Sequence, residues 1–233
     1  MDYIAELQKD IRFKEGLSAC MNCGICSAIC PAAEVYNYDP RVICNIVQEH
    51  DNDSIEELLK SETIWYCGEC MSCKTRCPRG NTPGFIIMAL RALSQDTGLF
   101  VASEKGRQQL YLKRTIGQWI LDYGYCLYMK NVTTHLHPEL GTVWDWIQDN
   151  WHKIFDKMEA NFEKEGEGVL RKIPQETLNE IRNIFEVTGA FKRYEAIEQF
   201  SVMKAKEMKL QINNTLQNEY IEHIYSVSNN HHQ

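Results

Sequence analysis

Two cysteine runs with the same spacing constrain this chain more than any other feature of its sequence. The first reads CMNCGICSAICP over residues 20–31, and the second reads CGECMSCKTRCP over residues 67–78. Each follows the pattern C-x2-C-x2-C-x3-C-P, which is the bacterial-ferredoxin spacing for [4Fe–4S] clusters. Every cysteine of the second run lies 47 positions after its counterpart, so the spacing is an internal repeat. The sequence therefore predicts two [4Fe–4S] clusters.

The geometry of such a run predicts how its cysteines are shared between the clusters. Three thiolates two residues apart lie along one tight loop and can wrap one cube, whereas the fourth follows a longer gap beside a proline and points away. We therefore expect the last cysteine of each run to serve the other cluster. The predicted ligands are Cys20, Cys23, Cys26 and Cys77 for cluster one, and Cys67, Cys70, Cys73 and Cys30 for cluster two. No catalytic residue is predicted.

Zinc and disulfide bonds are the two alternative uses of so many cysteines. Structural zinc sites usually combine two C-x2-4-C pairs separated by a longer loop, which differs from a repeated triple spacing with a trailing proline. Disulfides need an oxidising compartment. The first ten residues, MDYIAELQKD, have neither the basic nor the apolar region of a secretory signal. Both alternatives are therefore disfavoured, and a cytoplasmic location is expected.

Apolar runs are too short to predict a direct membrane span. A spanning helix needs about 18 or more apolar residues. The best stretch, residues 116–129, is interrupted by Gln118 and Asp122. Any link to a membrane is expected to come through a partner protein.

The formal net charge of −7 disfavours binding to nucleic acid, which requires a basic face. The second cysteine run is locally basic, because it carries Lys74 and Arg76 and is followed by Arg79. Nearby cations stabilise a reduced cluster and raise its potential. A solvated basic loop that only helps folding or docking is an equally good interpretation of these three residues.

The segments around the cysteine runs have helical patterns. Asp39 followed by Pro40 predicts a helix start, Asp53 is the expected cap of the next helix, and Thr82 with Pro83 predicts a third helix that ends near Gly98. Strand patterns are almost absent. The predicted fold is mainly α, with a helical two-cluster ferredoxin-like domain over residues 1–98 and a helical extension over residues 99–233.

The extension is rich in aromatic residues. Apolar side chains recur at intervals of three and four from Trp144 to Phe162, which predicts one helical stripe, and a further helix is expected from Pro174 to Gly189. Such a stripe can pack within the protein itself or form a docking surface for a partner. Both interpretations stay open at the level of sequence.

Two cysteines lie outside the cysteine runs, and two of the seven histidines lie close together in sequence. Cys44 and Cys126 have apolar neighbours, and we expect both to pack in the core as small hydrophobic residues. His135 and His137 could ligate a metal, but a third ligand is missing nearby, so a loop is the preferred interpretation. Glycine-rich phosphate-binding motifs are also missing from the sequence, which disfavours bound flavin or nucleotide.

The two runs, the helical segment between them and the ending RCPRG over residues 76–80 resemble the iron–sulfur C subunit of heterodisulfide reductase. The resemblance covers about residues 10–100, and all eight predicted ligands match its cluster cysteines. The tail is similar to that of the corresponding protein in heterodisulfide-reductase-like complexes of sulfur-oxidising microbes, in the dipeptide IP at residues 173–174 and the sequence IFEVTG at residues 184–189.

The resemblance implies a non-catalytic electron relay in an oxidoreductase complex. Its partners would be a flavin subunit (the A component) and a catalytic subunit (the B component) with Cys-Cys-Gly domains, which acts on a disulfide or on protein-bound sulfur. One alternative is an assembly or interaction subunit whose clusters are structural. Another is the iron–sulfur subunit of a different flavin-linked dehydrogenase, of the glycolate, lactate or succinate type. The sequence has neither an adjacent cysteine pair nor a plant-type C-x4-C-x2-C domain, which favours the simple relay.

Overall fold

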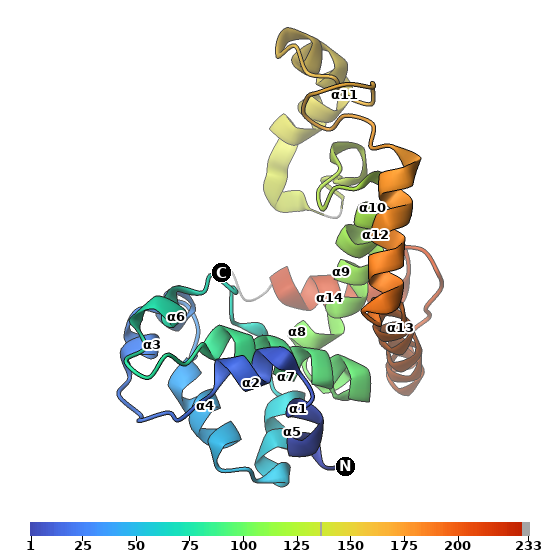
Figure 1. Ribbon diagram of the computed structural model, residues 1–233. Helices are drawn as coiled ribbons and strands as arrows, with labels where there is room; N and C mark the ends of the chain where they lie inside the picture. Colours follow the sequence, from blue (N-terminus) through green and yellow to red (C-terminus); the bar gives the residue numbers. More distant parts are fainter. Residues whose placement is uncertain (136, 230–233) are drawn as a thin grey trace. The chain divides into compact units, whose positions relative to one another are not determined.

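The structure is a computed structural model that describes residues 1–135 and 137–229, and Figure 1 shows its course. These described residues form helices and loops without any strand, which confirms the predicted all-helical fold. Contacts group them into two compact units. Residues 1–110 and the final segment from Glu195 on form unit 1, and Tyr111–Tyr194 forms unit 2.

This grouping by contacts differs from the two predicted domains, residues 1–98 and 99–233. Those domain ranges stay a prediction. The difference arises because the chain returns to unit 1 at its end, where α14 (Glu219–Asn229) packs against α8 (Glu104–Arg107). Tyr220, Ile221 and Ile224 of α14 are almost completely buried. The final segment is therefore part of the core of unit 1.

Unit 1 is built around one long helix, α7 (Pro83–Thr97), which packs against five shorter ones. Those five are α1 (Tyr3–Leu7), α2 (Ile11–Gly16), α4 (Pro40–Gln48), α5 (Asn52–Lys60) and α6 (Ser72–Arg76). A further short helix, α3 (Ile25–Ala28), packs against α4 and α6. Helices α9 (Gln109–Leu112) and α13 (Ala190–Glu207) cross the boundaries between the units.

The core of unit 1 lies on the buried face of α7. Ile86 and Leu90 are fully buried there and belong to one cluster with Ile43 of α4 and Leu59 of α5. The buried Ser94 hydroxyl donates a hydrogen bond of 2.7 Å to the carbonyl of Leu59, so that its polar group is satisfied inside the core.

The helix starts in unit 1 agree in part with the predicted caps. The Asp39 carboxylate accepts hydrogen bonds from the backbone N–H groups of Arg41 and Val42 and caps α4, as predicted. The prediction of Asp53 as the next cap is wrong, because Asp51 accepts the hydrogen bond from Ser54 and α5 begins one residue later. Asp53 lies in the first turn, where its charge favours the helix dipole.

Gly98 ends α7, as predicted, and position 98 requires glycine for two reasons. Its φ of +77° lies in the left-handed region that L side chains rarely adopt. A Cβ atom on Gly98 would also lie closer than 3.0 Å to the Phe200 ring of α13. Gly98 therefore lets two segments far apart in the sequence approach closely within unit 1.

Unit 2 contains a turn of π-helix (Lys113–Gly117), α10 (Gln118–Tyr123), α11 (Gly141–Lys157) and α12 (Gln175–Val187). Helix α12 packs against α10, and Arg182 donates a hydrogen bond of 3.1 Å to the carbonyl of Leu121. The predicted helix from Pro174 to Gly189 is confirmed within one or two residues at each end. Pro174 occupies the cap position, and Gly189 follows the helix with φ +76°.

The predicted aromatic stripe packs within unit 2, but it is not one helix. Helix α11 ends at Lys157, and Glu159 adopts φ +55°, which reverses the chain. Phe162 then folds back from the loop, and its ring centroid lies 4.4 Å from that of Trp151 and 4.7 Å from that of Phe155. The prediction was wrong for Phe162, because the stripe continues in space after the helix has ended.

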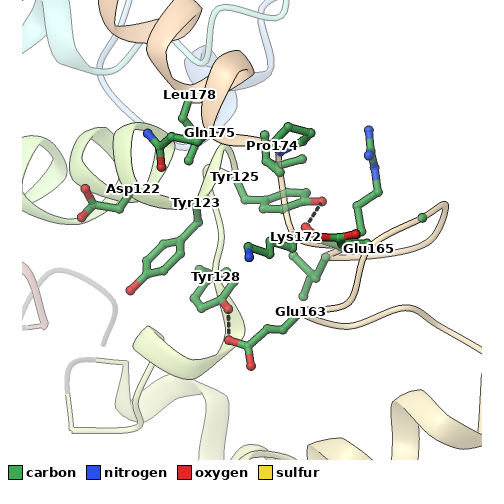
Figure 2. A pocket seen from close by; sticks show the side chains of 14 residues that line it. Asp122, Tyr123, Tyr125, Tyr128, Glu163, Glu165, Lys172, Pro174, Gln175 and Leu178 are labelled. Carbon is green, nitrogen blue, oxygen red and sulfur yellow. Dashed lines mark hydrogen bonds between the residues drawn. The ribbon is translucent and has the colours of Figure 1, made fainter.

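A hollow of about 800 Å³ lies beside this aromatic cluster in unit 2 (Figure 2). The rings of Tyr123 and Tyr128 stack with centroids 4.0 Å apart. The Tyr128 hydroxyl donates to the Glu163 carboxylate, which also pairs with Lys130 at 2.6 Å. The hydroxyl of Tyr125 donates to the carbonyl of Arg171 at 3.0 Å. These bonds hold the loop between α11 and α12 against the tyrosines.

Candidate metal centre

The two cysteine loops repeat in conformation as well as in spacing. Asn22 and Glu69 precede the second cysteine of each run and have φ values of +58° and +54°. Gly24 and Met71 follow that cysteine and have φ values of +78° and +59°. Each loop then enters a short helix, α3 or α6, that carries the third cysteine. Two left-handed residues around the middle cysteine curl each loop in the same way.

The fourth cysteine of each run lies just beyond that short helix. Cys30 has φ −79° and ψ 116°, and Cys77 has φ −73° and ψ 120°, so both are extended and each is followed by proline. The fourth cysteine of each run therefore has the same backbone conformation, and the crossing of ligands between the runs stays a prediction.

One cavity supports the predicted ligand set of cluster one. Cys20, Cys23 and Cys26 of the first run line it, and Cys77 of the second run completes the lining. The first three are contributed by the loop and by α3, while Cys77 follows α6, and these two helices pack against each other. A thiol from the second run is therefore directed at the first loop.

Tyr38 lies near two predicted ligands of cluster two, Cys67 and Cys30. Its side chain is only 4% exposed, and its hydroxyl hydrogen-bonds to Cys67 near Cys30. Burial raises the pKa of Tyr38 well above its usual range, and the neighbouring thiols of Cys67 and Cys30 raise it further. Tyr38, Cys67 and Cys30 thus belong to the same part of the unit 1 core.

The donor chemistry fits iron–sulfur cubes. Thiolates are the ligands of [4Fe–4S] clusters, and four of them surround one cavity here. Within the described ranges, 1–135 and 137–229, His, Cys, Asp and Glu side chains form no group of three or more that could hold a single metal ion. The thiol donors around the cavity suit an iron–sulfur cluster.

The environments of the thiols differ. Burial raises the pKa values of Cys26 and Cys73, whereas a hydrogen bond with Ser72 lowers the pKa of Cys70. Cys23 and Cys70, the middle cysteines of the two tight loops, are exposed. One predicted ligand of each cluster therefore reaches the surface.

Polar side chains that the sequence analysis did not select hold the cysteine loops. Buried Asn81 accepts a hydrogen bond of 2.8 Å from the N–H of Ser18 and donates one of 3.2 Å to the carbonyl of Ala19. It joins the segment before Cys20 to the segment after Cys77. An asparagine shortly after the second run was the available signal, but its partners are more than 60 positions away in sequence.

The three basic residues of the second run are exposed and lie in different surroundings. Arg79 lines the cavity of Cys20 and Cys77, as does Arg41 of α4. The amino group of Lys74 lies 5.5 Å from the centroid of the Phe85 ring. Arg79 therefore lies beside the cysteines predicted for cluster one, although it follows the second run in sequence. Tuning of potentials and assistance in docking both stay predictions for these charges.

Predictions for the other cysteines and histidines had mixed outcomes. Cys44 is 2% exposed and packs in the core of unit 1, as predicted, and it also lines the cavity of cluster one. The prediction of a buried Cys126 is wrong, because it is exposed in the loop after α10. His135 is exposed, and His137 lies in a loop with Nδ1 2.9 Å from Glu139.

None of the helices in residues 1–135 and 137–229 combines the length and apolar character needed to cross a membrane.

Comparisons with known proteins agree with the site. Residues 16–81 match the family described as "4Fe-4S dicluster domain". The C subunit of the ferredoxin:CoB-CoM heterodisulfide reductase of Methanosarcina acetivorans is 32% identical over 188 residues, which covers 80% of this chain and 68% of the relative. An iron–sulfur C subunit of the CoB–CoM heterodisulfide reductase of Methanocaldococcus jannaschii is 29% identical over 127 residues, which covers 54% of this chain and 61% of the relative.

A third relative, from Archaeoglobus profundus, is named as a protein like the heterodisulfide reductase C subunit. It is 30% identical over 129 residues, which covers 54% of this chain and 61% of the relative. The chain is a two-cluster [4Fe–4S] protein, as its cysteine spacing predicted. It belongs to the family of the iron–sulfur C subunit of heterodisulfide reductase.

Proposed function

We propose that this chain relays electrons between two partners of a cytoplasmic heterodisulfide-reductase-like complex, a flavin-containing protein and a catalytic protein. The catalytic partner, with its Cys-Cys-Gly domains, would act on a disulfide or on protein-bound sulfur. The proposed ligand sets are those predicted from the sequence, with Cys77 serving cluster one and Cys30 serving cluster two. The chain itself carries out no substrate chemistry in this proposal.

One observation carries the proposal, namely that cysteines from both runs line the same cavity. Shared ligands hold the two clusters within one small region, which favours rapid electron exchange between them. The exposed Cys23 and Cys70 give each cluster a ligand at the surface, where a partner protein can approach. A chain whose clusters only stabilised the fold would not need either ligand to be exposed.

Exposed apolar side chains on unit 2 support a docking role for part of the tail. Val143 and Trp146 on α11 are 69% and 59% exposed, and Ile184 and Val187 on α12 are 57% and 83% exposed. Large apolar side chains at a surface are typical of protein interfaces. The aromatic stripe of α11 packs into the core of unit 2. A docking surface on α11 would therefore lie on its other, exposed face.

The tail also bears on which branch of the family this chain resembles. The alignment with the Methanosarcina acetivorans protein extends over 188 residues, beyond the two-cluster segment, so part of the tail has a counterpart in that relative. Membership in the sulfur-oxidising branch stays a prediction, based on the tail sequences at residues 173–174 and 184–189.

An anaerobic redox titration followed by electron paramagnetic resonance tests the relay. We expect both clusters to accept and return one electron reversibly. If neither cluster is reduced at any accessible potential, the relay proposal fails, and an assembly protein with structural clusters becomes the favoured alternative. Affinity purification from the native organism tests the partners, and the expected result is recovery with a flavoprotein and a Cys-Cys-Gly protein.

A further inference from the structure

The first cysteine of each run is held by one side chain from the proline-started helix that follows the run. In α4 this side chain is Gln48, eight positions after Pro40, and in α7 it is Arg91, eight positions after Pro83. The two residues therefore occupy the same position, counted from the start of each helix. They also have the same type of partner, a cysteine backbone.

The hydrogen bonds show this equivalence. The Gln48 Oε1 atom accepts a hydrogen bond of 2.6 Å from the N–H of Cys20, and its Nε2 atom donates to the carbonyl of Cys20 at 3.3 Å. The Nη2 atom of Arg91 donates to the carbonyl of Cys67 at 2.6 Å. Each run thus has a side chain that fixes the position of its first cysteine. Gln48 is neutral and Arg91 is positively charged.

The charge of Arg91 is held rigidly and is largely shielded from water. Its Nε atom donates to the carbonyl of Ile64 at 2.6 Å, and its guanidinium carbon lies 5.6 Å from the centroid of the Trp65 ring. Glu69 pairs with Nη1 at 2.6 Å and offsets part of the charge. The Arg91 side chain is only 17% exposed, whereas that of Glu69 is 40% exposed, so water screens the carboxylate more than the guanidinium.

We propose that Arg91 makes the two clusters electronically unequal and that cluster two, the cluster of Cys67, holds the electron in the one-electron-reduced chain. This inference rests on the proposed relay and on the predicted ligand sets. Reduction adds a negative charge to a cluster, and a fixed cation beside its ligand stabilises that charge. Cluster one has neutral Gln48 at the equivalent position. Two cations, Arg41 and Arg79, line its cavity, but water screens both more than Arg91, because the Arg41 side chain is 36% exposed and paired with Asp39 and Arg79 is exposed. Arg91 bonds to the backbone carbonyl of Cys67 and would therefore act as a positioning residue that tunes the potential of the cluster.

The equivalence of the two positions supplies matched variants. Arg91→Gln gives cluster two the side chain that cluster one has, and its amide can still donate to the carbonyl of Cys67. Gln48→Arg is the reciprocal change. Arg91→Lys keeps the charge but loses the forked geometry that reaches three acceptors. Cys23→Ala and Cys70→Ala identify the spectroscopic signal of each cluster by removing it.

The experiment is an anaerobic redox titration of the full chain with both clusters, followed by electron paramagnetic resonance. In Arg91→Gln we expect the electron distribution to shift at least tenfold away from cluster two, which equals about 59 mV for a one-electron couple. Arg91→Lys is expected to keep most of the difference, and Gln48→Arg to shift the distribution toward cluster one. The signal of the other cluster is the internal control in each variant.

Three outcomes decide the matter. An Arg91→Gln protein with full iron content and an unchanged distribution overturns the inference and leaves the proposed relay intact. If Arg91→Gln loses cluster two, Gln48→Arg becomes the test. An unchanged distribution of the electron between the clusters in Gln48→Arg then overturns the inference. If neither cluster of the unaltered protein accepts an electron, the proposed relay fails, and this inference fails with it.

Discussion

Asn81 gives the sharpest test of how the two cysteine runs are joined. Its buried amide forms two hydrogen bonds, to the N–H of Ser18 and the carbonyl of Ala19, and so links the segments that carry Cys20 and Cys77. We expect Asn81→Ala to loosen this link and to destabilise cluster one more than cluster two.

The magnitude follows from the number of bonds and from the exposure of the partners. A typical hydrogen bond contributes about 1 kcal/mol net, so the loss of two costs about 2 kcal/mol. The larger cost of an unpaired buried group does not apply, because Ser18 is exposed and water can replace the amide there. If iron leaves cluster one through local opening of this segment, a loss of about 2 kcal/mol accelerates its release about thirtyfold.

Iron release to a chelator under anaerobic conditions measures this effect, with electron paramagnetic resonance of the reduced protein reporting each cluster separately. Asn150→Ala is the matched control, since the Asn150 amide bonds within its own helix α11, to the carbonyl of Trp146 and to the amino group of Lys153. The reasoning is refuted if Asn81→Ala releases iron no faster than Asn150→Ala. It is also refuted if both clusters lose iron at the same increased rate.

Three further predictions concern single positions. Cys77→Ala is expected to abolish cluster one and Cys30→Ala cluster two in spectra of the purified variants, and loss of the cluster of the same run would contradict the crossing. Gly98→Ala is expected to lower the free energy of unfolding by about 3 kcal/mol, because alanine there has an unfavourable left-handed φ and also clashes with Phe200. Gly189→Ala is expected to lower it by only about 1 kcal/mol, because Gly189 has the same kind of φ but open space around it. Equal urea midpoints for the two variants would contradict the clash. Asp39→Ala removes the cap of α4 and is expected to cost about 1 kcal/mol in urea unfolding, and an unchanged midpoint would mean that the cap is dispensable.

Local patterns predicted the elements of unit 1 well. The cysteine spacing predicted two clusters, and the proline and glycine signals predicted the ends of α7 and the start of α4. Asp51 and Asp53 are both good caps, and only the three-dimensional course of the preceding turn decides between them. Cys126 has apolar neighbours in sequence, but Gly124 ends α10 with φ +77°, and the loop that follows leaves the thiol exposed.

The equivalence of Gln48 and Arg91 was not apparent from the sequence. The cysteines repeat at an interval of 47 residues, but the prolines that start α4 and α7 are 43 residues apart, so one alignment cannot match both. Only the shared hydrogen-bond partners reveal that the two positions correspond. Similarly, the return of the chain to unit 1 depends on contacts of Tyr220 and its neighbours, which have no local signature.

That return has a consequence for the order of events during synthesis. The ribosome completes both cysteine runs by residue 77, but Tyr220, Ile221 and Ile224, which are buried in the same unit, follow more than 140 residues later. All of unit 2 is made in the interval. The cluster-binding segments thus exist as a nascent chain well before the core around them is complete, which leaves a period in which assembly factors can deliver iron and sulfide.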